Sequence, residues 1–307
     1  MRILIRVFLG LLLEVPPAPA QQVTLPQEKG SVRFAVIGDS GTGEKLQYET
    51  ADRLRLARQQ FPFDFVLMMG DNIYGTKAPR DFLRKFELPY KALLDQKVSF
   101  YASLGNHDVA EEQQYKPFNM NGQRYYSFKK GNVGFFVLDS NYMDPDQLKW
   151  LTGQLQNSSD EWKIAFFHHP LYSSAAAHGS SVELRGILEP LFQKYGVQVV
   201  FSGHDHVYER MTPQKGIFYF TEGSSGQLRR GDVRGAGFTA KFFDTDCAFM
   251  LVEITQNELY FQTLSRTGET VDSGKVTRTD MQKEIIPAAR QPRETAPQVL
   301  QTRPELR

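Results

Sequence analysis

The residues best suited to chemistry are two histidines separated by one residue, His204 and His206, in the sequence Gly-His-Asp-His. They directly follow residues 197–202, an apolar and largely β-branched run that predicts a buried strand. A chain leaving a strand can turn both imidazoles toward one point, and imidazole is the commonest metal ligand. This fragment therefore predicts a metal site at the carboxyl end of a strand.

Four earlier strand-like runs are each followed by polar residues in a similar way. The fragments after them are Gly-Asp-Ser-Gly at 38–41, Gly-Asp-Asn-Ile-Tyr at 70–74, Gly-Asn-His-Asp at 105–108 and His-His-Pro at 168–170. In layered α/β folds, ligands bind outside the carboxyl ends of strands. Five such ends carrying Asp, Asn, Tyr or His point to one shared metal site.

Each fragment has an ordinary structural explanation when it is taken alone. Asp39 and Asn106 are typical turn residues. Tyr74 suits a half-buried aromatic position, and a lone His168 would more often be a hydrogen-bonded core histidine. Five fragments in this order, each after a strand, are very improbable by chance, so we interpret them together.

The segments between these fragments predict the elements that must position them. Strands are expected at 31–37, 64–69 and 98–104, with helices at 44–60 and near 79–95, interrupted at Pro89. A hairpin with a Gly-Asn turn is expected at 124–138, followed by helices at 144–156 and 183–195 and further strands at 163–167, 216–221, 249–254 and 258–264. Helices outside two packed mixed sheets would satisfy both the alternating first half and the hairpin-rich second half.

Composition narrows the class of protein. The chain has 307 residues and a formal net charge of +1, so no global field argues for nucleic acid or an anionic membrane as partner. The single cysteine, Cys247, excludes an intramolecular disulfide and a cysteine-based zinc site.

The two ends of the chain differ from the rest. Residues 1–20 combine a basic start, a short apolar core and Ala-Pro-Ala, which predicts a signal peptide and hence a secreted or periplasmic protein, with an uncleaved anchor as the alternative. After cleavage no stable membrane insertion is expected. Residues 21–30 predict a linker, 31–276 the main domain, and 277–307 a disordered tail rich in Pro, Gln, Arg and Glu.

Taken together, the five fragments resemble the purple acid phosphatases, including the tartrate-resistant type, within the calcineurin-like metallophosphoesterases. The resemblance covers roughly residues 32–264 and is most specific at 203–210, Gly-His-Asp-His-Val-Tyr-Glu-Arg. It implies an α/β fold, a four-layer αββα sandwich of two mixed β-sheets flanked by helices.

The resemblance also implies a binuclear metal centre, with one ion held by Asp39, Tyr74 and His206, the other by Asn106, His168 and His204, and Asp71 between them. Carboxylate and phenolate oxygens suit Fe³⁺, whereas neutral imidazoles and an amide oxygen suit a divalent ion such as Fe²⁺, Zn²⁺ or Mn²⁺.

Gly41 separates this chain from most of its wider superfamily, and the adjacent His168 and His169 are two candidates for one ligand position. Most metallophosphoesterases have a histidine ligand where Gly41 stands, so a ligand is missing and Tyr74 can supply it. If Tyr74 instead packs as a core aromatic, the first metal site is one ligand short. Of the adjacent His168 and His169, the His-x-Pro register favours His168, and we expect His169 to support the site or to pack.

The function implied is an acid phosphatase that hydrolyses small phosphate monoesters by direct attack of a metal-bound hydroxide. His107 is the expected donor to the phosphate or the leaving oxygen. His178 is a second candidate, for which an exposed loop histidine is an equal alternative. The alternatives for the whole protein are a phosphodiesterase on the same metal core and a metal- or phosphate-binding protein without turnover.

Overall fold

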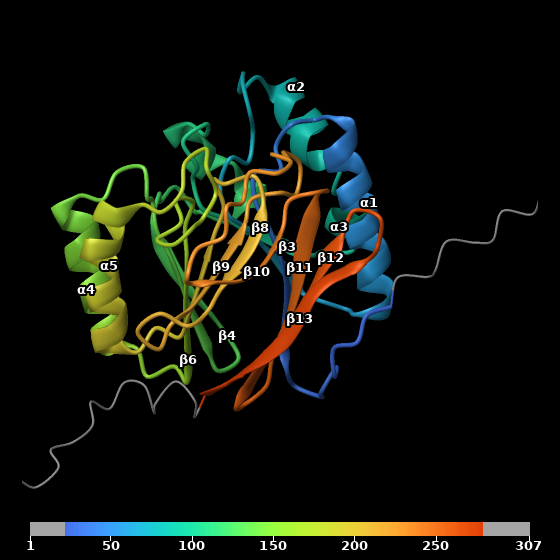
Figure 1. Ribbon diagram of the computed structural model, residues 1–307. Coiled ribbons are helices and arrows are strands. Elements are labelled where there is room, and N and C mark those ends of the chain that lie inside the picture. Colours follow the sequence, from blue (N-terminus) through green and yellow to red (C-terminus); the bar gives the residue numbers. More distant parts are fainter. Residues whose placement is uncertain (1–21, 279–307) are drawn as a thin grey trace, which may run out of the picture.

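The computed structural model describes residues 22–278, which form two packed β-sheets covered by helices (Figure 1). The first sheet contains β1 (Val32–Ile37), β2 (Phe65–Met68), β3 (Ser99–Ala102), β11 (Ala248–Ile254), β12 (Glu258–Ser265) and β13 (Thr270–Thr277), in the order β13-β12-β11-β1-β2-β3. The second contains β4 (Tyr126–Lys130), β5 (Val133–Val137), β6 (Trp162–Phe166), β7 (Val199–Ser202), β8 (Tyr208–Met211), β9 (Phe218–Glu222) and β10 (Thr239–Phe243), in the order β10-β8-β9-β7-β6-β5-β4.

Both sheets are mixed: the parallel strands form one end of the first sheet and the centre of the second. Strands β1, β2 and β3 are parallel, while β11 joins β1 in antiparallel register. Strands β5, β6, β7 and β9 are parallel in the second sheet. The carboxyl ends of neighbouring parallel strands lie at one edge of a sheet, which is where the expected site residues follow.

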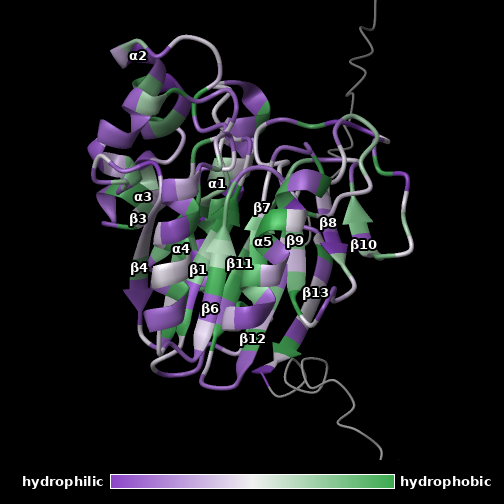
Figure 2. Ribbon diagram, turned by 90° about the vertical axis from the view of Figure 1, so that its left-hand side faces the viewer, coloured by the Kyte–Doolittle hydropathy of each residue, from purple (hydrophilic) through white to green (hydrophobic). Residues whose placement is uncertain are grey.

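The two sheets meet through an aromatic core. Phe34 on β1 stacks on Phe65 with ring centroids 5.2 Å apart, and its edge meets Phe135 and Phe201 of the other sheet at 5.6 and 6.2 Å. All four side chains are buried, and hydrophobic, green strands fill the centre of the molecule in Figure 2. Strands buried on both faces need continuous apolar runs, which explains why these segments lack polar alternation.

Helices cover the outer faces, so the four-layer expectation is confirmed. The helix α1 (Lys45–Gln60) and the short α3 (Lys91–Asp95) lie on one side, and α4 (Pro145–Asn157) and α5 (Val182–Tyr195) lie on the other (Figure 1). As expected, Asp144 caps α4 by accepting a hydrogen bond from the Gln147 N–H at 2.7 Å, and Pro145 is its first residue.

The region expected to be a helix near 79–95 is more irregular than predicted. It consists of α2 (Pro79–Phe82), a π-helical turn η1 (Leu83–Glu87) and α3, with the break at Pro89 where it was expected. Short 3₁₀ helices η2 (Ala110–Gln114) and η3 (Lys116–Phe118) follow β3. Strands β8, β10 and β13 were not expected, because their sequences carry charged or small polar residues instead of an apolar run.

The linker was expected at residues 21–30, and its described part, residues 22–30, runs along the first sheet. The Thr24 N–H donates to Gln262 Oε1 at 2.8 Å, and the Gln27 and Glu28 N–H groups donate to the Glu253 carboxylate at 2.7 and 2.6 Å. The expected signal peptide and nearly all of the expected tail lie outside the described residues. No helix within residues 22–278 has the length and apolar character needed to cross a membrane.

Candidate metal centre

The expected metal ligands all follow the carboxyl ends of parallel strands. Asp39 follows β1, Asp71 and Tyr74 follow β2, and Asn106 follows β3 in the first sheet. In the second sheet His168 follows β6, and His204 and His206 follow β7. The structure therefore brings residues separated by up to 167 positions to one end of the sandwich.

Three of these residues have a backbone conformation that non-glycine residues rarely adopt. The φ angles of Asp39, Asp71 and His204 are 51°, 51° and 71°. A left-handed conformation costs roughly 1–2 kcal/mol per such residue, and residues held this way cluster at functional sites. The strain here coincides with three positions expected to bind metal.

The first group of side chains consists of Asp39, Tyr74 and His206, which we call the oxygen-rich half. Tyr74 Oη lies 3.2 Å from Asp39 Oδ1 and 3.2 Å from His206 Nε2. His206 Nε2 lies 3.4 Å from Asp39 Oδ1. The Tyr74 hydroxyl thus points into the site, and the ring does not simply pack into the core.

Gly41 explains how Tyr74 reaches this position. A Cβ at Gly41 would lie 1.9 Å from the Asn72 carbonyl oxygen, so only glycine allows the two loops to come this close. The loops are joined by hydrogen bonds from the Gly41 N–H to the Asp71 carbonyl at 3.1 Å and from the Tyr74 N–H to the Gly41 carbonyl at 2.9 Å. A histidine side chain cannot occupy this position with the same backbone.

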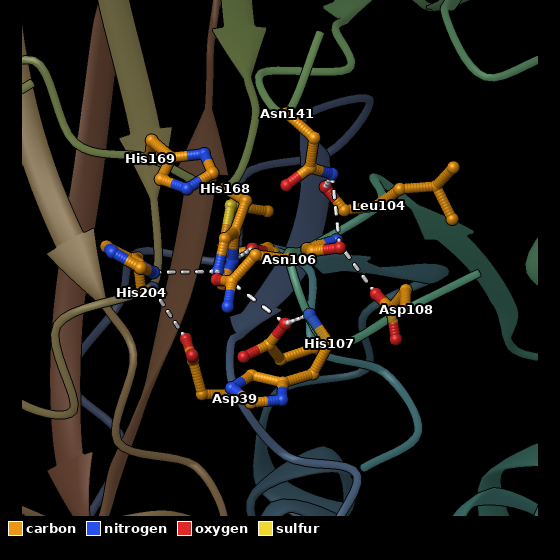
Figure 3. A network of polar contacts seen from close by, with 12 residues as sticks. Asp39, Leu104, Asn106, His107, Asp108, Asn141, His168, His169 and His204 are labelled. Atoms are coloured by element: carbon orange, nitrogen blue, oxygen red, sulfur yellow. Dashed lines mark hydrogen bonds and ion pairs between the residues drawn. The ribbon is translucent and has the colours of Figure 1, made fainter. Parts of the chain in front are cut away.

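The second group consists of Asn106, His168 and His204, which we call the nitrogen-rich half (Figure 3). His168 Nε2 lies 2.8 Å from Asn106 Oδ1 and 3.1 Å from His204 Nδ1. The other ring nitrogen of His168 contacts the Met69 carbonyl oxygen at 2.9 Å. Since a carbonyl only accepts, Nδ1 carries the proton and Nε2 presents its lone pair to the site.

Asp71 lies between the two halves and is fully buried. Its Oδ1 accepts a hydrogen bond from the His107 N–H at 2.9 Å and lies 3.6 Å from His168 Nε2. Its Oδ2 has no hydrogen-bond partner among the described residues. A buried carboxylate oxygen without a partner is costly unless a cation or donor satisfies it, so this residue fits a bridging role.

The electrostatics of the site also fit bound cations. Burial and the neighbouring Asp71 raise the pKa of Asp39 well above its usual value. Burial lowers the pKa of His204 to about 2 and that of His206 to about 4, and it lowers the pKa of His168 well below its usual value. These imidazoles are therefore neutral and able to donate lone pairs, and a cation would offset the cost of the adjacent buried carboxylates.

His107 and His178 lie beside different halves of the site. The His107 ring lies 4.9 Å from the Tyr74 ring, beside the oxygen-rich half, and its side chain is exposed. The His178 ring lies 4.2 Å from the His204 ring, beside the nitrogen-rich half, and is also exposed. Both imidazoles stand where a molecule entering from solvent would meet them.

Asp108 and Asn72 hold the loops that carry the site residues. The Asp108 carboxylate accepts hydrogen bonds from Asn72 Nδ2 at 2.8 Å, from the Gly105 N–H at 2.8 Å and from the Ile73 N–H at 3.1 Å. Burial and nearby Asp71 raise the pKa of Asp108 to about 6. These contacts of Asp108 join two loops, and none of them involves the His107 side chain.

His169 lies beside the nitrogen-rich half of the site. Its ring centroid is 4.4 Å from that of His204, and its Nδ1 lies 2.9 Å from Ser140 Oγ. Donor atoms of His168, His169 and His204 lie within 4.8 Å of one another. Ser140 follows the end of β5, a sixth strand end at this site. The short polar sequence Asp139-Ser140 after an apolar run was the signal that could have indicated this strand end.

Arg229, in the Gly-rich loop 223–237, lies beside the site histidine His206. Its backbone N–H donates to the His206 carbonyl at 3.0 Å and its Nε lies 3.4 Å from His206 Nδ1. Its charge adds to burial in lowering the pKa of His206. A cavity of about 480 Å³ is lined by Asn106 and His169 together with Arg124 and Asn141.

Comparison with known proteins agrees with this geometry. Residues 32–208 match the family model described as calcineurin-like phosphoesterase, and the chain belongs to that family. It is 31% identical to purple acid phosphatase 4 of Arabidopsis thaliana, over 81% of this chain and 85% of that protein. It is 24% identical to human tartrate-resistant acid phosphatase type 5, over 81% of this chain and 91% of that protein.

A solved structure shows the same fold. The purple acid phosphatase PPD1 from yellow lupin seeds superposes with a TM-score of 0.72 at 17% sequence identity, covering 87% of this chain and 58% of that chain. Within the calcineurin-like phosphoesterases, the chain is thus a relative of the purple acid phosphatases. It is a hydrolytic enzyme, a phosphatase with a binuclear metal centre.

Proposed function

We propose that the two halves of the site hold two different metal ions. Asp39, Tyr74 and His206 would bind Fe³⁺, and Asn106, His168 and His204 would bind Fe²⁺, Zn²⁺ or Mn²⁺, with Asp71 as the shared ligand. The observation that carries this proposal is the meeting of two three-residue groups at one buried carboxylate whose Oδ2 is unpartnered. When bound, the metal pair would activate water and polarise the phosphate ester.

Two histidines beside the centre, His107 and His178, would contact the substrate. His107 is placed beside the oxygen-rich half, with its backbone fixed by the hydrogen bond to Asp71 at 2.9 Å. Its exposed imidazole would donate a hydrogen bond to the phosphate or to the leaving oxygen. His178, against His204, would contact the substrate from the opposite side.

The proposed substrates are small phosphate monoesters, hydrolysed by direct transfer of the phosphoryl group to water without a covalent intermediate. The chain itself supplies no nucleophile in this proposal, because the polar groups that converge on Asp71 are metal ligands or donors. We further propose that the protein is exported, on the signal-like sequence of residues 1–20.

Rates with p-nitrophenyl phosphate and bis-p-nitrophenyl phosphate test the proposed substrate class. We expect the monoester to be the better substrate, and Asp71→Ala to lose activity on both. A higher kcat/KM for the diester would favour the phosphodiesterase alternative on the same metal core. Full phosphatase activity in Asp71→Ala would contradict both, and metal binding without turnover on either compound would favour a binding protein.

The identity of the metals is tested by elemental analysis together with a visible absorption spectrum. A tyrosinate bound to Fe³⁺ absorbs visible light by charge transfer, so iron-loaded protein should be violet or pink. A colourless, iron-free but active enzyme would contradict the iron assignment and leave a zinc or manganese phosphatase.

A further inference from the structure

The loop that carries His178 is closed at its neck by two serines. The Ser173 N–H donates to Ser180 Oγ at 3.0 Å, and Ser180 Oγ donates to the Ser173 carbonyl at 3.0 Å. Gly179, directly after His178, has φ of +75°, which glycine adopts without strain. We call residues 173–180 the His178 loop.

The base of the His178 loop is held by Glu209 on β8, a fully buried carboxylate. Glu209 Oε2 accepts a hydrogen bond from the Ser174 N–H at 2.8 Å, and Oε1 accepts from Ser174 Oγ at 2.6 Å and from Thr239 Oγ1 at 2.6 Å. A buried carboxylate with three donors makes strong, charge-assisted hydrogen bonds. Ser174 is therefore fixed to the second sheet through its backbone and its side chain.

The side of the His178 loop is held by residues 231–234 of the Gly-rich loop. Ala175 forms an isolated antiparallel bridge with Val233. The Ala176 N–H donates to the Asp232 carbonyl at 2.9 Å, and the Arg234 N–H donates to the Ser174 carbonyl at 3.0 Å. The Gly-rich loop is itself joined to the metal centre, because the Gln227 N–H donates to the Asp39 carbonyl at 3.1 Å.

These contacts restrict the position of His178. Backbone atoms are fixed at Ser174, Ala175 and Ala176, and the neck closes two residues after His178. The histidine ring consequently lies against His204 although its side chain is exposed to solvent. An exposed loop histidine with no such support would sample many positions.

We propose that Glu209 is a positioning residue that sets His178 over the nitrogen-rich half of the centre, acting through Ser174. This inference rests on the proposed contact of His178 with the substrate. Glu209 lies three residues after His206, on β8, the strand that follows the Gly-His-Asp-His fragment. Its described contacts include no residue assigned to the metals. One short segment would therefore carry two metal ligands and the support for a substrate-contacting loop.

A double-mutant cycle between Glu209 and His178 tests the proposal. We expect His178→Ala to lower kcat/KM, and Glu209→Gln to lower it about tenfold to a hundredfold, as a displaced catalytic group does. Because Glu209 acts through His178, Glu209→Gln should have no further effect when His178 is already Ala. Effects that multiply in the double variant would overturn the proposal, as would wild-type kcat/KM in Glu209→Gln beside an impaired His178→Ala.

Hydrogen exchange supplies a readout that does not depend on turnover. In Glu209→Gln the amides of residues 174–179 should exchange faster, with unchanged metal content. The matched control is Tyr208→Phe, the neighbouring residue on β8, which loses a buried hydrogen bond to Asp272 of 2.8 Å and does not contact the loop. The control should leave both loop exchange and kcat/KM as in wild type, and unchanged loop exchange in Glu209→Gln would overturn the proposal.

Ser174→Ala keeps the test open if Glu209→Gln does not fold. It removes only the hydroxyl that donates to Glu209 at 2.6 Å, so we expect a smaller change of kcat/KM in the same direction, again absent in the His178→Ala background. If His178→Ala itself has wild-type kinetics, the contact of His178 with substrate is wrong and this inference falls with it. The metal centre and the phosphatase assignment would then still stand on the Asp71→Ala result.

Discussion

The two halves of the metal centre share one carboxylate but differ in their donor atoms. The oxygen-rich half joins a carboxylate, a phenol and one imidazole at separations of 3.2–3.4 Å. The nitrogen-rich half joins two imidazoles and an amide oxygen at 2.8–3.1 Å. Hard oxygen donors and neutral nitrogen donors prefer different ions, so this difference supports the proposal that the site holds two unlike metals.

The halves also differ in how the fold supports them. Asp39 and Tyr74 come from neighbouring strand ends of the first sheet, whose loops are joined through Gly41. Asn106 and His168 come from different sheets and meet across the sandwich. Strand β7 serves both halves, since His204 contributes to one and His206 to the other. The centre thus forms only when the two sheets are packed together.

The largest effect is expected from removing the residue that the halves share. Asp71→Ala should reduce kcat/KM by about a thousandfold or more, since a metal contributes several kcal/mol to the transition state and 1.36 kcal/mol is a factor of ten. Elemental analysis should show that both ions are lost or weakened. Loss of one ion alone, with the other kept at full occupancy, would mean that Asp71 belongs to one half only.

The next effect concerns the proton donor beside the oxygen-rich half. His107→Ala should lower kcat by about 10²–10⁴-fold, the usual range for a general acid or base, while the metal content stays unchanged. Esters with good leaving groups should suffer less, because they need less protonation. An equal loss for good and poor leaving groups would restrict His107 to binding the phosphate.

Tyr74→Phe should change the spectrum more than the rate. It removes the phenolic oxygen that lies 3.2 Å from Asp39 Oδ1 and leaves the other residues of both halves in place. We expect the visible band to disappear and activity to fall less than in Asp71→Ala. An unchanged visible band in Tyr74→Phe would show that the colour has another source.

The smallest effect concerns the pH dependence of stability and involves Glu112, a buried carboxyl group close to Asp108. Burial and nearby Asp108 raise the pKa of Glu112 to about 9, and Lys77, 3.5 Å away, opposes them only in part. The folded protein therefore keeps a proton that the unfolded chain releases above about pH 4.5, so this residue costs stability as pH rises from there to about 9.

For one proton this slope is at most about 1.4 kcal/mol per pH unit. In Glu112→Gln the free energy of unfolding should fall less steeply with pH than in wild type, measured by urea unfolding between pH 5 and 8. Identical slopes in the two proteins would show that Glu112 is ionised in the folded state.

Much of this arrangement could be predicted because the strands are apolar on both faces and end in short polar fragments. The runs before Asp39, Asp71, Asn106, His168 and His204 all form strands of the central sheets. Which residues share a half came from the family resemblance, because spacing along the chain does not say which strand ends face each other. The edge strand β10, with mostly exposed residues around Lys241, gave no apolar pattern to recognise.

Other parts of the site could not be predicted because the contacts that form them join residues far apart in the sequence. Glu209 belongs to the fragment 203–210, in which its sequence neighbours do not indicate a supporting role. Its contact with Ser174 joins residues 35 positions apart. The closeness of His169 to His204 depends on how β6 and β7 pair in parallel, which fixes both strand ends at one edge. Only the packed sheets bring such pairs together.

Anomalous diffraction from crystals of the metal-loaded protein, recorded at the iron edge and at the edge of the second metal, tests the central claim most directly. We predict two peaks per chain on either side of Asp71, with iron among Asp39, Tyr74 and His206 and the divalent ion among Asn106, His168 and His204. A single peak, or ions bound away from Asp71, would contradict a binuclear centre built from these two halves.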